Sequence, residues 1–583
     1  MGPLARVAQF GRPVAPRLML AVLGGAGAAG AAVGLTATSA WLLSRAAQEP
    51  PILYLMVAIT AVRAFGIGRA VLRYAERLAA HDAAFRILAD LRGRAYARLE
   101  RLAPAGIAEF RSGDLLARLV ADVDGLADLW LRVLLPFAVA GPAGLCAALL
   151  VGALVPAAGA FLAASLLLVA VGGPLLVNRV TGRAERRLAP ARGELAAASL
   201  DLLAGAPELL AAGTLPARMA DLSALNAAVA AGEKRVAAGA GIGTLIAGLA
   251  SGAAVWLALA VGIQAVRAGR LDGVALAVVA LTPIAAHEAV AGLIPAAQHV
   301  PGLTAAAERL LDVLGRPDPV REPPEPAALP PGPCGLRLRG LRARYGDGQE
   351  VLRGIDLELG PGERALVTGP SGSGKSTLSA ILLRFLEPSG GTVELVSSGG
   401  PIDIRLLAGD DVRRAVGVAA QDPHVFNASI AENLRLARPN ATRAELRAAL
   451  SAARLLDWVD TLPDGLDTGV GEHGARLSGG QRQRLSLARL LLAQRSILIL
   501  DEPTEHLDES MAAELMRDVL AATAGRTVVV LTHRPELMGS VDWAASIDLG
   551  PAPGPAPASR DRPHTLHLEK TAEALSFQAM SRG

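Results

Sequence analysis

The sequence predicts an all-α membrane domain of six spanning helices, followed by an α/β domain built around a glycine-rich loop. Long apolar runs fill the first half of the 583-residue chain, and short strand and helix patterns separated by glycine turns follow residue 315. Hydrophobic residues make up 52% of the chain, and the mean hydropathy is +0.39. Such values are typical of membrane proteins rather than of soluble enzymes of this length.

Each of six apolar runs holds roughly twenty residues or more, the length that crosses a bilayer. Charged residues interrupt the second and the sixth run. Buried helices of a large soluble protein are the alternative, but the run "GGAGAAGAAVG" favours close helix packing in lipid. We place the six spans at 18–44, 51–75, 129–154, 156–179, 240–267 and 273–298.

The distribution of arginine predicts the orientation of the spans. Three arginines precede the first span, and the long stretches 76–128 and 180–239 are rich in arginine, whereas the connections around Gln48 and Pro156 are poor in it. Positive loops remain in the cytoplasm, so both termini and the second domain are expected there. The two arginine-rich stretches are expected to be membrane helices that continue into the cytoplasm, with turns at their tips.

Charge and cysteine content exclude other classes of function. The formal net charge is +3 and the arginines are spread along the chain, so no nucleic-acid footprint is expected. Cys146 and Cys334 lie far apart in different kinds of sequence, which argues against a disulfide framework or a thiolate metal site. No removable signal peptide is recognisable at the N-terminus.

Prolines divide the chain into domains. The stretch "GRPDPVREPPEPAALPPGP" cannot build a helix or a central strand and is interpreted as a linker. The expected organisation is a transmembrane domain at 1–314, a linker at 315–333, an α/β domain at 334–550 and a flexible Pro/Ala-rich tail at 551–583.

The stretch "GERALVTGPSGSGKSTL" supplies an apolar strand, a glycine loop and a helix start, with the spacing of a P-loop. The loop backbone N–H groups wrap phosphates, Lys375 adds a charge at the β- and γ-phosphates, and the Ser376 hydroxyl binds magnesium. The predicted ATP-binding residues here are Gly369, Ser371, Gly372, Gly374, Lys375, Ser376 and Thr377.

A second motif, "RSILILDEP", is an apolar strand that ends in two carboxylates. Asp501 is placed to hold magnesium, and Glu502 to polarise the attacking water. Between the two motifs, Ser478, Gly479, Gly480 and Gln481 open a helix in "RLSGGQRQRLSLARLLL", and His533 follows in "VVVLTHR". These motifs in this order resemble the ATP-binding cassette (ABC) domain over about residues 335–550.

The resemblance implies further roles. Tyr345 is expected to stack on adenine, Gln421 to sense the γ-phosphate and contact magnesium, Glu502 to act as catalytic base and His533 as switch histidine. Ser478, Gly479, Gly480 and Gln481 match the signature motif, which faces the ATP of an opposite cassette. One cassette and six spans therefore resemble a half-transporter of the exporter type, which needs a partner. The tips near Asp114 and in Leu200–Leu210 resemble its coupling helices.

The D-loop "DEPTEHLD" carries Glu505 and His506 before Asp508, where most exporters have small residues. It resembles the CydC-type subunit of the heterodimeric CydDC transporters, which are tied to cytochrome bd assembly. The stretches "LRYAERLAAHDAAFRILADLR" and "AAHEAVAGLIPA" agree. The resemblance implies a CydD-like partner, a bacterial inner-membrane location, and cysteine, glutathione or haem as cargo. Lineage-specific packing is favoured over new chemistry for Glu505 and His506.

Arginines at intervals of four residues place one polar face on the second span and its extension. Arginine within a bilayer usually faces a cavity or an anion. His81 with Arg77 and Arg73 is a candidate haem site, in which imidazole binds the iron and guanidinium a propionate. Capping or solvation of a cytoplasmic helix is the alternative for His81. His287 and Glu288 either line a cavity or pair with these arginines.

Two other functions compete with this one. A homodimeric exporter of lipids or drugs would share the cassette, and small D-loop residues would have favoured it. A haem-binding assembly or sensor protein would use ATP to change shape without moving cargo. ATP-dependent movement of a thiol or haem into vesicles separates transport from sensing.

Overall fold

The computed structural model describes residues 2–107, 118–345, 348–505, 507–538 and 541–550. The chain forms two compact units, a helical unit that ends at Pro317 and a mixed α/β unit that comprises the chain from Asp318 onward together with the segment Leu102–Ala108. Asp114, His506 and the tail at 551–583 lie outside the described residues, so the expectations that fall on them have no structural counterpart here.

Six helices in the described part of the chain are long and apolar enough to cross a membrane, which confirms the predicted six spans. They occupy Pro3–Ala46, Ile52–Leu102, Val120–Leu154, Pro156–Gly182, Leu215–Arg267 and Gly273–Gly315. The helical elements that form these stretches and their extensions are α1 (Pro3–Ala8), η1 (Gln9–Val14), α2 (Ala15–Ala46), η2 (Ile52–Tyr54), α3 (Met56–Leu102), η4 (Arg118–Asp122), α5 (Val123–Asp128), η5 (Leu129–Leu134), α6 (Leu135–Leu154), α7 (Pro156–Leu167), η6 (Leu168–Gly172), α8 (Gly173–Ala204), α10 (Leu215–Arg267), α11 (Gly273–Val290) and α12 (Leu293–Gly315).

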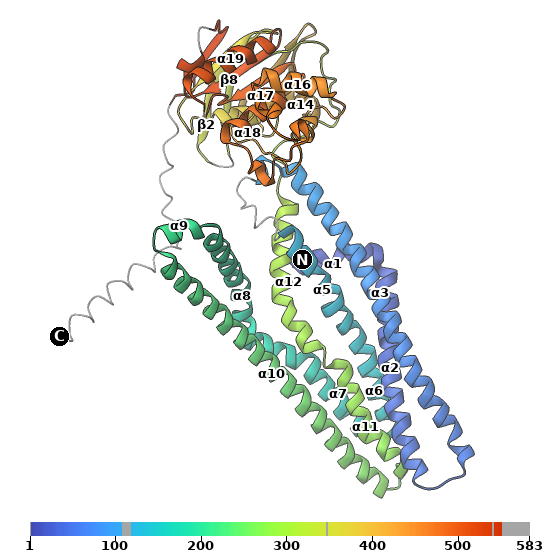
Figure 1. Ribbon diagram of the computed structural model, residues 1–583. Helices are drawn as coiled ribbons and strands as arrows, with labels where there is room; N and C mark the ends of the chain where they lie inside the picture. Colours follow the sequence, from blue (N-terminus) through green and yellow to red (C-terminus); the bar gives the residue numbers. More distant parts are fainter. Residues whose placement is uncertain (1, 108–117, 346–347, 506, 539–540, 551–583) are drawn as a thin grey trace, which may run out of the picture. The chain divides into compact units, whose positions relative to one another are not determined.

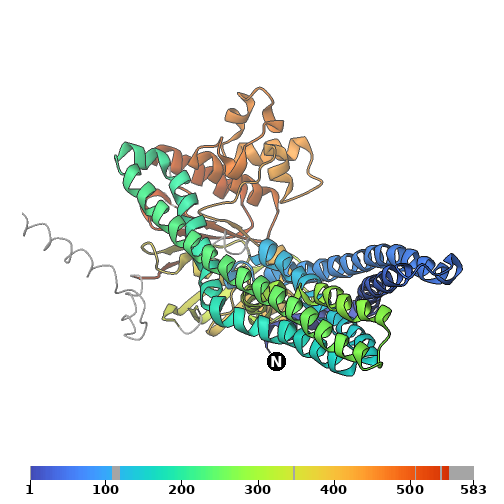
Figure 2. The same cartoon turned by 90° about the horizontal axis from the view of Figure 1, so that it is seen from below.

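Several helices continue far beyond the apolar stretch that predicted each span. α3 holds 47 residues and α10 holds 53, about twice the length that a bilayer requires. The short η3 (Ala105–Ile107) follows α3, and the short α9 (Ala206–Ala211) joins α8 to α10. In both views, the α2–α3 hairpin and the α8–α10 hairpin diverge to opposite sides of the helical unit (Figures 1 and 2). α9 corresponds to the predicted tip at Leu200–Leu210.

Glycines allow the helices of this unit to approach closely. A Cβ on Gly159 of α7 would lie 2.4 Å from the Cα of Gly152 in α6, so the two backbones are in direct contact. A Cβ on Gly239 of α10 would lie 2.0 Å from Cγ2 of Thr181 in α8. Lipid provides no hydrophobic drive between helices, so this close packing is what holds them together.

Charged pairs join the helical extensions. Arg309 of α12 donates two hydrogen bonds to Asp122 of η4, each at 2.6 Å. Arg92 of α3 pairs with Asp124 of α5. A bidentate guanidinium–carboxylate pair fixes orientation as well as distance, so these contacts set how the extensions lie against one another.

The second unit contains two sheets. The antiparallel sheet has the order β2–β1–β4–β5, and the parallel sheet has the order β6–β7–β8–β3–β9. Both faces of the central parallel strands are buried, which matches their Val/Ile/Leu-rich sequences. The strands are β1 (Gly335–Arg344), β2 (Glu350–Leu359), β3 (Arg364–Thr368), β4 (Gly390–Ser397), β5 (Gly400–Asp403), β6 (Val416–Ala419), β7 (Ile497–Asp501), β8 (Thr527–Thr532) and β9 (Ala545–Asp548).

The helices of this unit cover the parallel sheet and form a separate helical layer beside it. The α-helices are α13 (Lys375–Leu382), α14 (Gly409–Ala415), α15 (Ile430–Arg435), α16 (Arg443–Ala452), α17 (Leu456–Asp460), α18 (Gly479–Leu492) and α19 (Glu509–Ala522). Short 3-10 turns are η7 (Ile404–Leu406), η8 (Gly465–Asp467), η9 (Glu472–Gly474) and η10 (Pro535–Met538).

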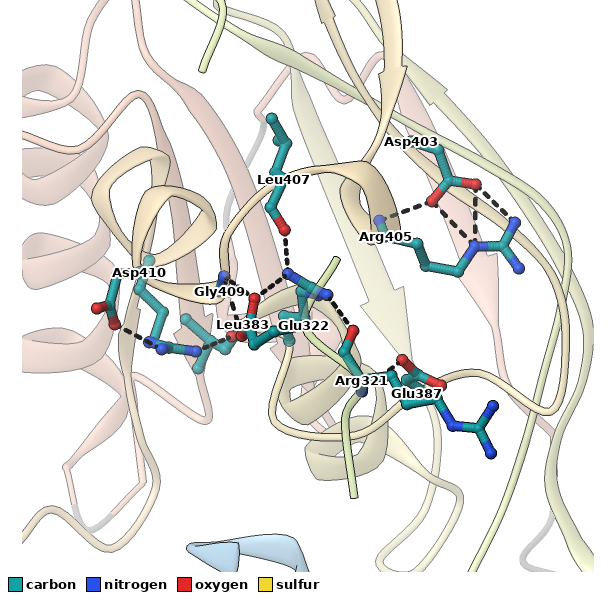
Figure 3. Close-up of polar contacts among 11 residues, drawn as sticks. Arg321, Glu322, Leu383, Glu387, Asp403, Arg405, Leu407, Gly409 and Asp410 are labelled. Atoms are coloured by element: carbon teal, nitrogen blue, oxygen red, sulfur yellow. Dashed lines mark hydrogen bonds and ion pairs between the residues drawn. The ribbon is translucent and has the colours of Figure 1, made fainter. Parts of the chain in front are cut away.

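Part of the proline-rich stretch is attached to the second unit. Arg384, whose side chain is 2% exposed, pairs with Glu322 at 3.1 Å and donates to the carbonyl of Arg321 at 2.7 Å. Glu322 also accepts from the backbone N–H of Gly409 at 3.1 Å (Figure 3). Ala327 forms a parallel bridge with Leu407. The stretch from Arg321 to Ala327 is therefore held on the surface of this unit, although its prolines exclude regular structure.

Candidate functional site

The phosphate-binding loop lies between the central strand β3 and the helix α13. β3 pairs in parallel with β8 on one side and β9 on the other, so its carboxyl end is fixed in position. The loop turns sharply because Gly372 and Gly374 adopt φ values of +82° and +104°, which residues other than glycine rarely adopt. The N-terminus of α13 follows directly, and its N–H groups favour anions.

A cavity of about 720 Å³ opens beside this loop. It brings together ten of the residues expected to bind or hydrolyse ATP, namely Tyr345, Ser371, Gly372, Gly374, Lys375, Ser376, Thr377, Gln421, Glu502 and His533. Val351, Pro370 and Glu505 also line it and had not been expected there. Gly369 contributes through its carbonyl, which accepts from Lys375 at 2.7 Å. The hydroxyl of Tyr345 lies 3.4 Å from Thr377 Oγ1, at the rim of the cavity.

Three charged or polar side chains form one network at the cavity floor. Lys375 Nζ lies 3.3 Å from Glu502 Oε1, and both side chains are less than 10% exposed. On the other side of the carboxylate, Nδ1 of His533 lies 2.8 Å from Oε2. The backbone N–H of His533 donates to the same oxygen at 3.3 Å. Both carboxylate oxygens of Glu502 are thus held at fixed positions.

The backbone of Glu502 is also constrained. Its φ is +50°, a left-handed conformation that is uncommon outside glycine and costs energy. The N–H of Glu502 donates to the carbonyl of Leu531 at 2.9 Å, and its carbonyl accepts from the buried side chain of Gln483. Gln483 had not been predicted as a site residue. Its position five residues after Ser478, on the buried face of α18, was the available signal.

Asp501 has the properties of a magnesium ligand. Burial, followed by the neighbouring charge of Glu502, raises the pKa of Asp501 to about 6. Its Oδ1 atom is buried and makes no hydrogen bond, while Oδ2 lies 3.5 Å from the hydroxyl of Ser376. A buried carboxylate oxygen without a donor is suited to a cation, so Ser376 and Asp501 fit magnesium, with Gln421 on the same cavity wall.

The signature residues are ordered but lie away from this cavity. Ser478 caps α18: its hydroxyl accepts from the N–H of Gln481 at 3.2 Å, and the Gln481 side chain accepts from the N–H of Ser478 at 2.8 Å. This reciprocal capping box leaves the N-terminus of α18 at the surface. Among the described residues, none from Ser478 to Gln481 lines the ATP cavity of this chain.

The D-loop residues have separate positions. Glu505 lines the nucleotide cavity, and its charge is a minor cause of the raised pKa of Asp501. Asp508 caps α19, because its Oδ1 accepts from the N–H of Met511 at 2.8 Å. Lineage-specific packing of Glu505, favoured from the sequence, stays a prediction, and its location in the cavity lining had not been expected.

His81 and the arginines Arg69, Arg73 and Arg77 of α3 lie on exposed surface of the helical unit. Nδ1 of His81 donates to the carbonyl of Arg77 at 2.8 Å, because a carbonyl can only accept, and Nε2 is therefore the nitrogen suited to a metal. Arg73 lies 3.7 Å from Glu76. Glu288 of α11 pairs with Arg69 of α3 at 3.0 Å, so the expected partnership with the arginine face exists. His287 is instead buried, with Nδ1 bonded to the Pro283 carbonyl.

Comparisons with known proteins place this geometry in context. The family described as "ABC transporter" matches residues 352–505. The chain is 33% identical over 512 residues to the glutathione/L-cysteine transport system ATP-binding/permease protein CydD of Bacillus subtilis, covering 85% of this chain and 86% of that protein. It is 31% identical to the corresponding protein CydC of Escherichia coli, covering 86% and 88%.

A solved structure has the same fold over nearly the whole length. A bacterial Atm1-family ABC exporter with ATP bound superimposes with a TM-score of 0.78, covering 98% of this chain and 99% of that one at 21% identity. At that identity the likeness concerns the fold alone. It confirms six spans followed by an α/β nucleotide-binding domain.

Proposed function

The chain belongs to the ABC transporter family, among relatives named CydC and CydD, and on this basis we propose that it exports cysteine or glutathione as the CydC-like half of a heterodimer. It is an integral membrane ATPase that couples hydrolysis to transport. The observation that carries the thiol proposal is similarity over more than four fifths of both chains to proteins named for glutathione and L-cysteine transport.

The geometry of the cavity supports a specific division of roles in hydrolysis. The anionic β- and γ-phosphates compete for Lys375, which now pairs with Glu502, so nucleotide binding would release one carboxylate oxygen. Glu502 then orients and polarises the attacking water, while His533 keeps the other oxygen in place. Ser376 and Asp501, with Gln421, would hold magnesium, which would supply positive charge to the phosphates.

Two features support a partner subunit. The signature residues Ser478 to Gln481 are preorganised by the capping box but do not line this chain's own ATP cavity. The apolar span within α3 is also the least buried of the six, with 6% of its residues buried against 50% in the span formed by α11 and α12. A CydD-like half-transporter would supply a second cassette and would cover part of α3.

The proposed orientation places the nucleotide-binding domain and both termini in the cytoplasm, because arginine is concentrated in the extensions on that side. α9, at the tip of the α8–α10 hairpin, would serve as a coupling helix that transmits cassette closure to the spans. A CydC-like role would connect the export of thiols to the assembly of cytochrome bd oxidase.

Haem is a second candidate cargo, favoured by one observation. Nε2 of His81 remains suited to iron, and Arg77 and Arg73 lie on successive turns of the same helix, where they would meet propionates. A haem-binding sensor that moves no cargo would use the same residues.

Vesicle transport tests these alternatives. The chain is purified with its partner subunit and reconstituted, and ATP-dependent movement of labelled cysteine, glutathione and haem is measured together with ATPase stimulation. We expect movement and stimulation with a thiol. Stimulation by haem alone, accompanied by a Soret band that His81→Ala removes, would replace the thiol proposal. Haem binding without movement of any cargo would favour the sensor.

A further inference from the structure

An ion pair joins two spans within the apolar part of the helical unit. Arg69 of α3 donates through Nη2 to Oε1 of Glu288 in α11 at 3.0 Å. At 1.5 Å per residue, Arg69 lies about 20 Å along α3 from its start at Met56, and Glu288 about 22 Å along α11 from its start at Gly273. Both charges are therefore at the depth of the membrane-spanning segments, where ionisable residues are costly and usually functional.

The pair borders a small cavity that is lined mainly by alanines. Its volume is about 40 Å³, and besides Arg69, Arg73 and Glu288 its lining consists of alanines, Ala28, Ala29, Ala32, Ala285 and Ala289. That volume holds two or three water molecules, which is also the size of a small charged group. The side chains of Arg69 and Glu288 are 47% and 65% exposed, so the helices of this chain do not enclose either of them.

A second cation is available beside the pair. Arg73 lines the same cavity and lies 3.7 Å from Glu76, beyond hydrogen-bond distance. Glu76 is 8% exposed and packs against Gly24 and Gly25 of α2, where a Cβ would lie 3.3 Å from its side chain. Glu76 is thus fixed against α2, while the Arg73 side chain is 60% exposed and lines the cavity.

The charge pattern selects among ligands. A ligand that carries only carboxylates would take Arg69 from Glu288 and leave that acid without a partner inside the membrane, which is strongly unfavourable. A zwitterion avoids this cost, because its carboxylate replaces Glu288 on Arg69 while its ammonium replaces Arg69 on Glu288. One ion pair is exchanged for two, and no charge is left uncompensated.

We propose that Arg69, Arg73 and Glu288 form a binding site for the free α-amino acid group of the cargo, with its carboxylate on the arginines and its ammonium on Glu288. This inference rests on the proposed thiol export and specifies what part of the thiol is recognised. Cysteine and the γ-glutamyl end of glutathione both carry this group, whereas haem carries carboxylates and no ammonium. The site recognises the α-amino acid group of the cargo and makes no contact that depends on the sulfur.

Four analogues test the site in the complex purified with its partner. Cysteine and S-methylcysteine carry the whole group, N-acetylcysteine lacks the ammonium, and cysteine methyl ester lacks the carboxylate. Binding is measured by calorimetry and by the concentration for half-maximal ATPase stimulation. Because a charged hydrogen bond is lost, N-acetylcysteine and the methyl ester are expected to bind about tenfold more weakly or worse, and S-methylcysteine as well as cysteine.

Two variants and a control identify the residues. Glu288→Gln removes both the partner of the ammonium and the acid that N-acetylcysteine would leave unpaired. It is expected to weaken cysteine, to strengthen N-acetylcysteine, and so to abolish the preference between the two. Arg69→Gln is expected to weaken cysteine and N-acetylcysteine but not the methyl ester. Arg63→Gln removes a cation from the same helix outside the cavity lining and should leave the order of analogues unchanged. A merely structural pair would weaken all four analogues equally in both variants, and that result would overturn the site.

The test separates this inference from the proposed function. If vesicles transport cysteine and N-acetylcysteine equally well, the site is wrong and thiol export stands. If cysteine binds with the expected order of analogues but is not transported, the site stands and the export proposal fails. If neither the four analogues nor glutathione binds, both are wrong.

Discussion

The molecule contains two ion pairs of similar length in very different surroundings. Lys375 and Glu502 lie 3.3 Å apart with side chains 8% and 4% exposed, whereas Arg69 and Glu288 lie 3.0 Å apart with side chains 47% and 65% exposed. The first pair is held by a strand end, a helix start and a histidine. The second joins two helices beside a cavity. The difference indicates that burial and His533 keep the carboxylate of Glu502 in position even when phosphates take Lys375, whereas the charges of the membrane pair are free to move when a ligand replaces one of them.

The largest effect is expected at Glu502, in the buried pair. Glu502→Gln keeps the size of the side chain and removes the base, so the ATPase rate of the complex is expected to fall by about 10²–10⁴-fold. The rate is measured as phosphate released per complex in detergent or in vesicles. Retained turnover would mean that the cassette of the partner carries hydrolysis.

A matched control lies in the same cavity. Glu505→Gln also removes one carboxylate from the lining, but among the described residues the Glu505 side chain has no partner comparable with Lys375 and His533, which hold Glu502. The rate is expected to change by less than about threefold, because the groups that position water stay in place. A loss as large as that of Glu502→Gln would give Glu505 a direct part in hydrolysis.

The sequence was sufficient for the parts of this site that depend on local motifs. A strand, a glycine loop and a helix start in immediate succession predict where Lys375 and Ser376 lie, and the six apolar runs predict the spans. The positive φ of Glu502, the contact from Gln483 and the pairing of Arg69 with Glu288 depend on how distant segments pack. Periodicity within one helix cannot supply that information, since it gives a face and no partner for it.

Asp501 provides the second test of the preorganised site. Its pKa is raised to about 6, from an ordinary value of 3.8, chiefly by burial. Between these values the folded state binds more protons than the unfolded state, so stability falls as pH rises from about 4 to about 6, by about 3 kcal/mol in total. Above about pH 6 and without magnesium, the ionised Asp501 carboxylate lowers the free energy of unfolding by this full amount.

Asp501→Asn removes this cost. In EDTA at neutral pH the variant is expected to gain up to about 3 kcal/mol in the free energy of unfolding of its nucleotide domain, and to lose the dependence on pH between about 4 and 6. Denaturant unfolding of the wild-type protein and the variant at about pH 4 and at neutral pH measures both changes. Magnesium with ATP should then stabilise the wild-type protein and not the variant. A variant less stable than wild type at neutral pH in EDTA would contradict this account.

A smaller loss of stability is expected from a substitution in the attached proline-rich stretch, where a control residue lies three positions away. Glu322→Ala leaves the buried guanidinium of Arg384 with carbonyl acceptors only, which is expected to cost about 1–3 kcal/mol of stability. Glu325 is exposed in the same stretch, and Glu325→Ala is expected to stay within about 0.5 kcal/mol. Proteolysis between Arg321 and Ala327 should accelerate in the first variant alone. Equal effects would show that the stretch is not held through Arg384.

The smallest effect is expected at an exposed pair between two helical extensions. Arg192 of α8 and Glu233 of α10 lie 2.7 Å apart with side chains 59% and 49% exposed. Glu233→Gln is expected to cost less than about 1 kcal/mol, and less still at high salt, because solvent screens such pairs. Thermal unfolding at low and high salt measures the change. A loss above about 2 kcal/mol that persists in salt would mean that the pair is covered in the assembled transporter, since burial is what separates costly pairs from inexpensive ones. In both units, the distance between the charged atoms would then say little about the role of an ion pair. Its burial in the complex with the partner would determine how much the pair contributes to stability.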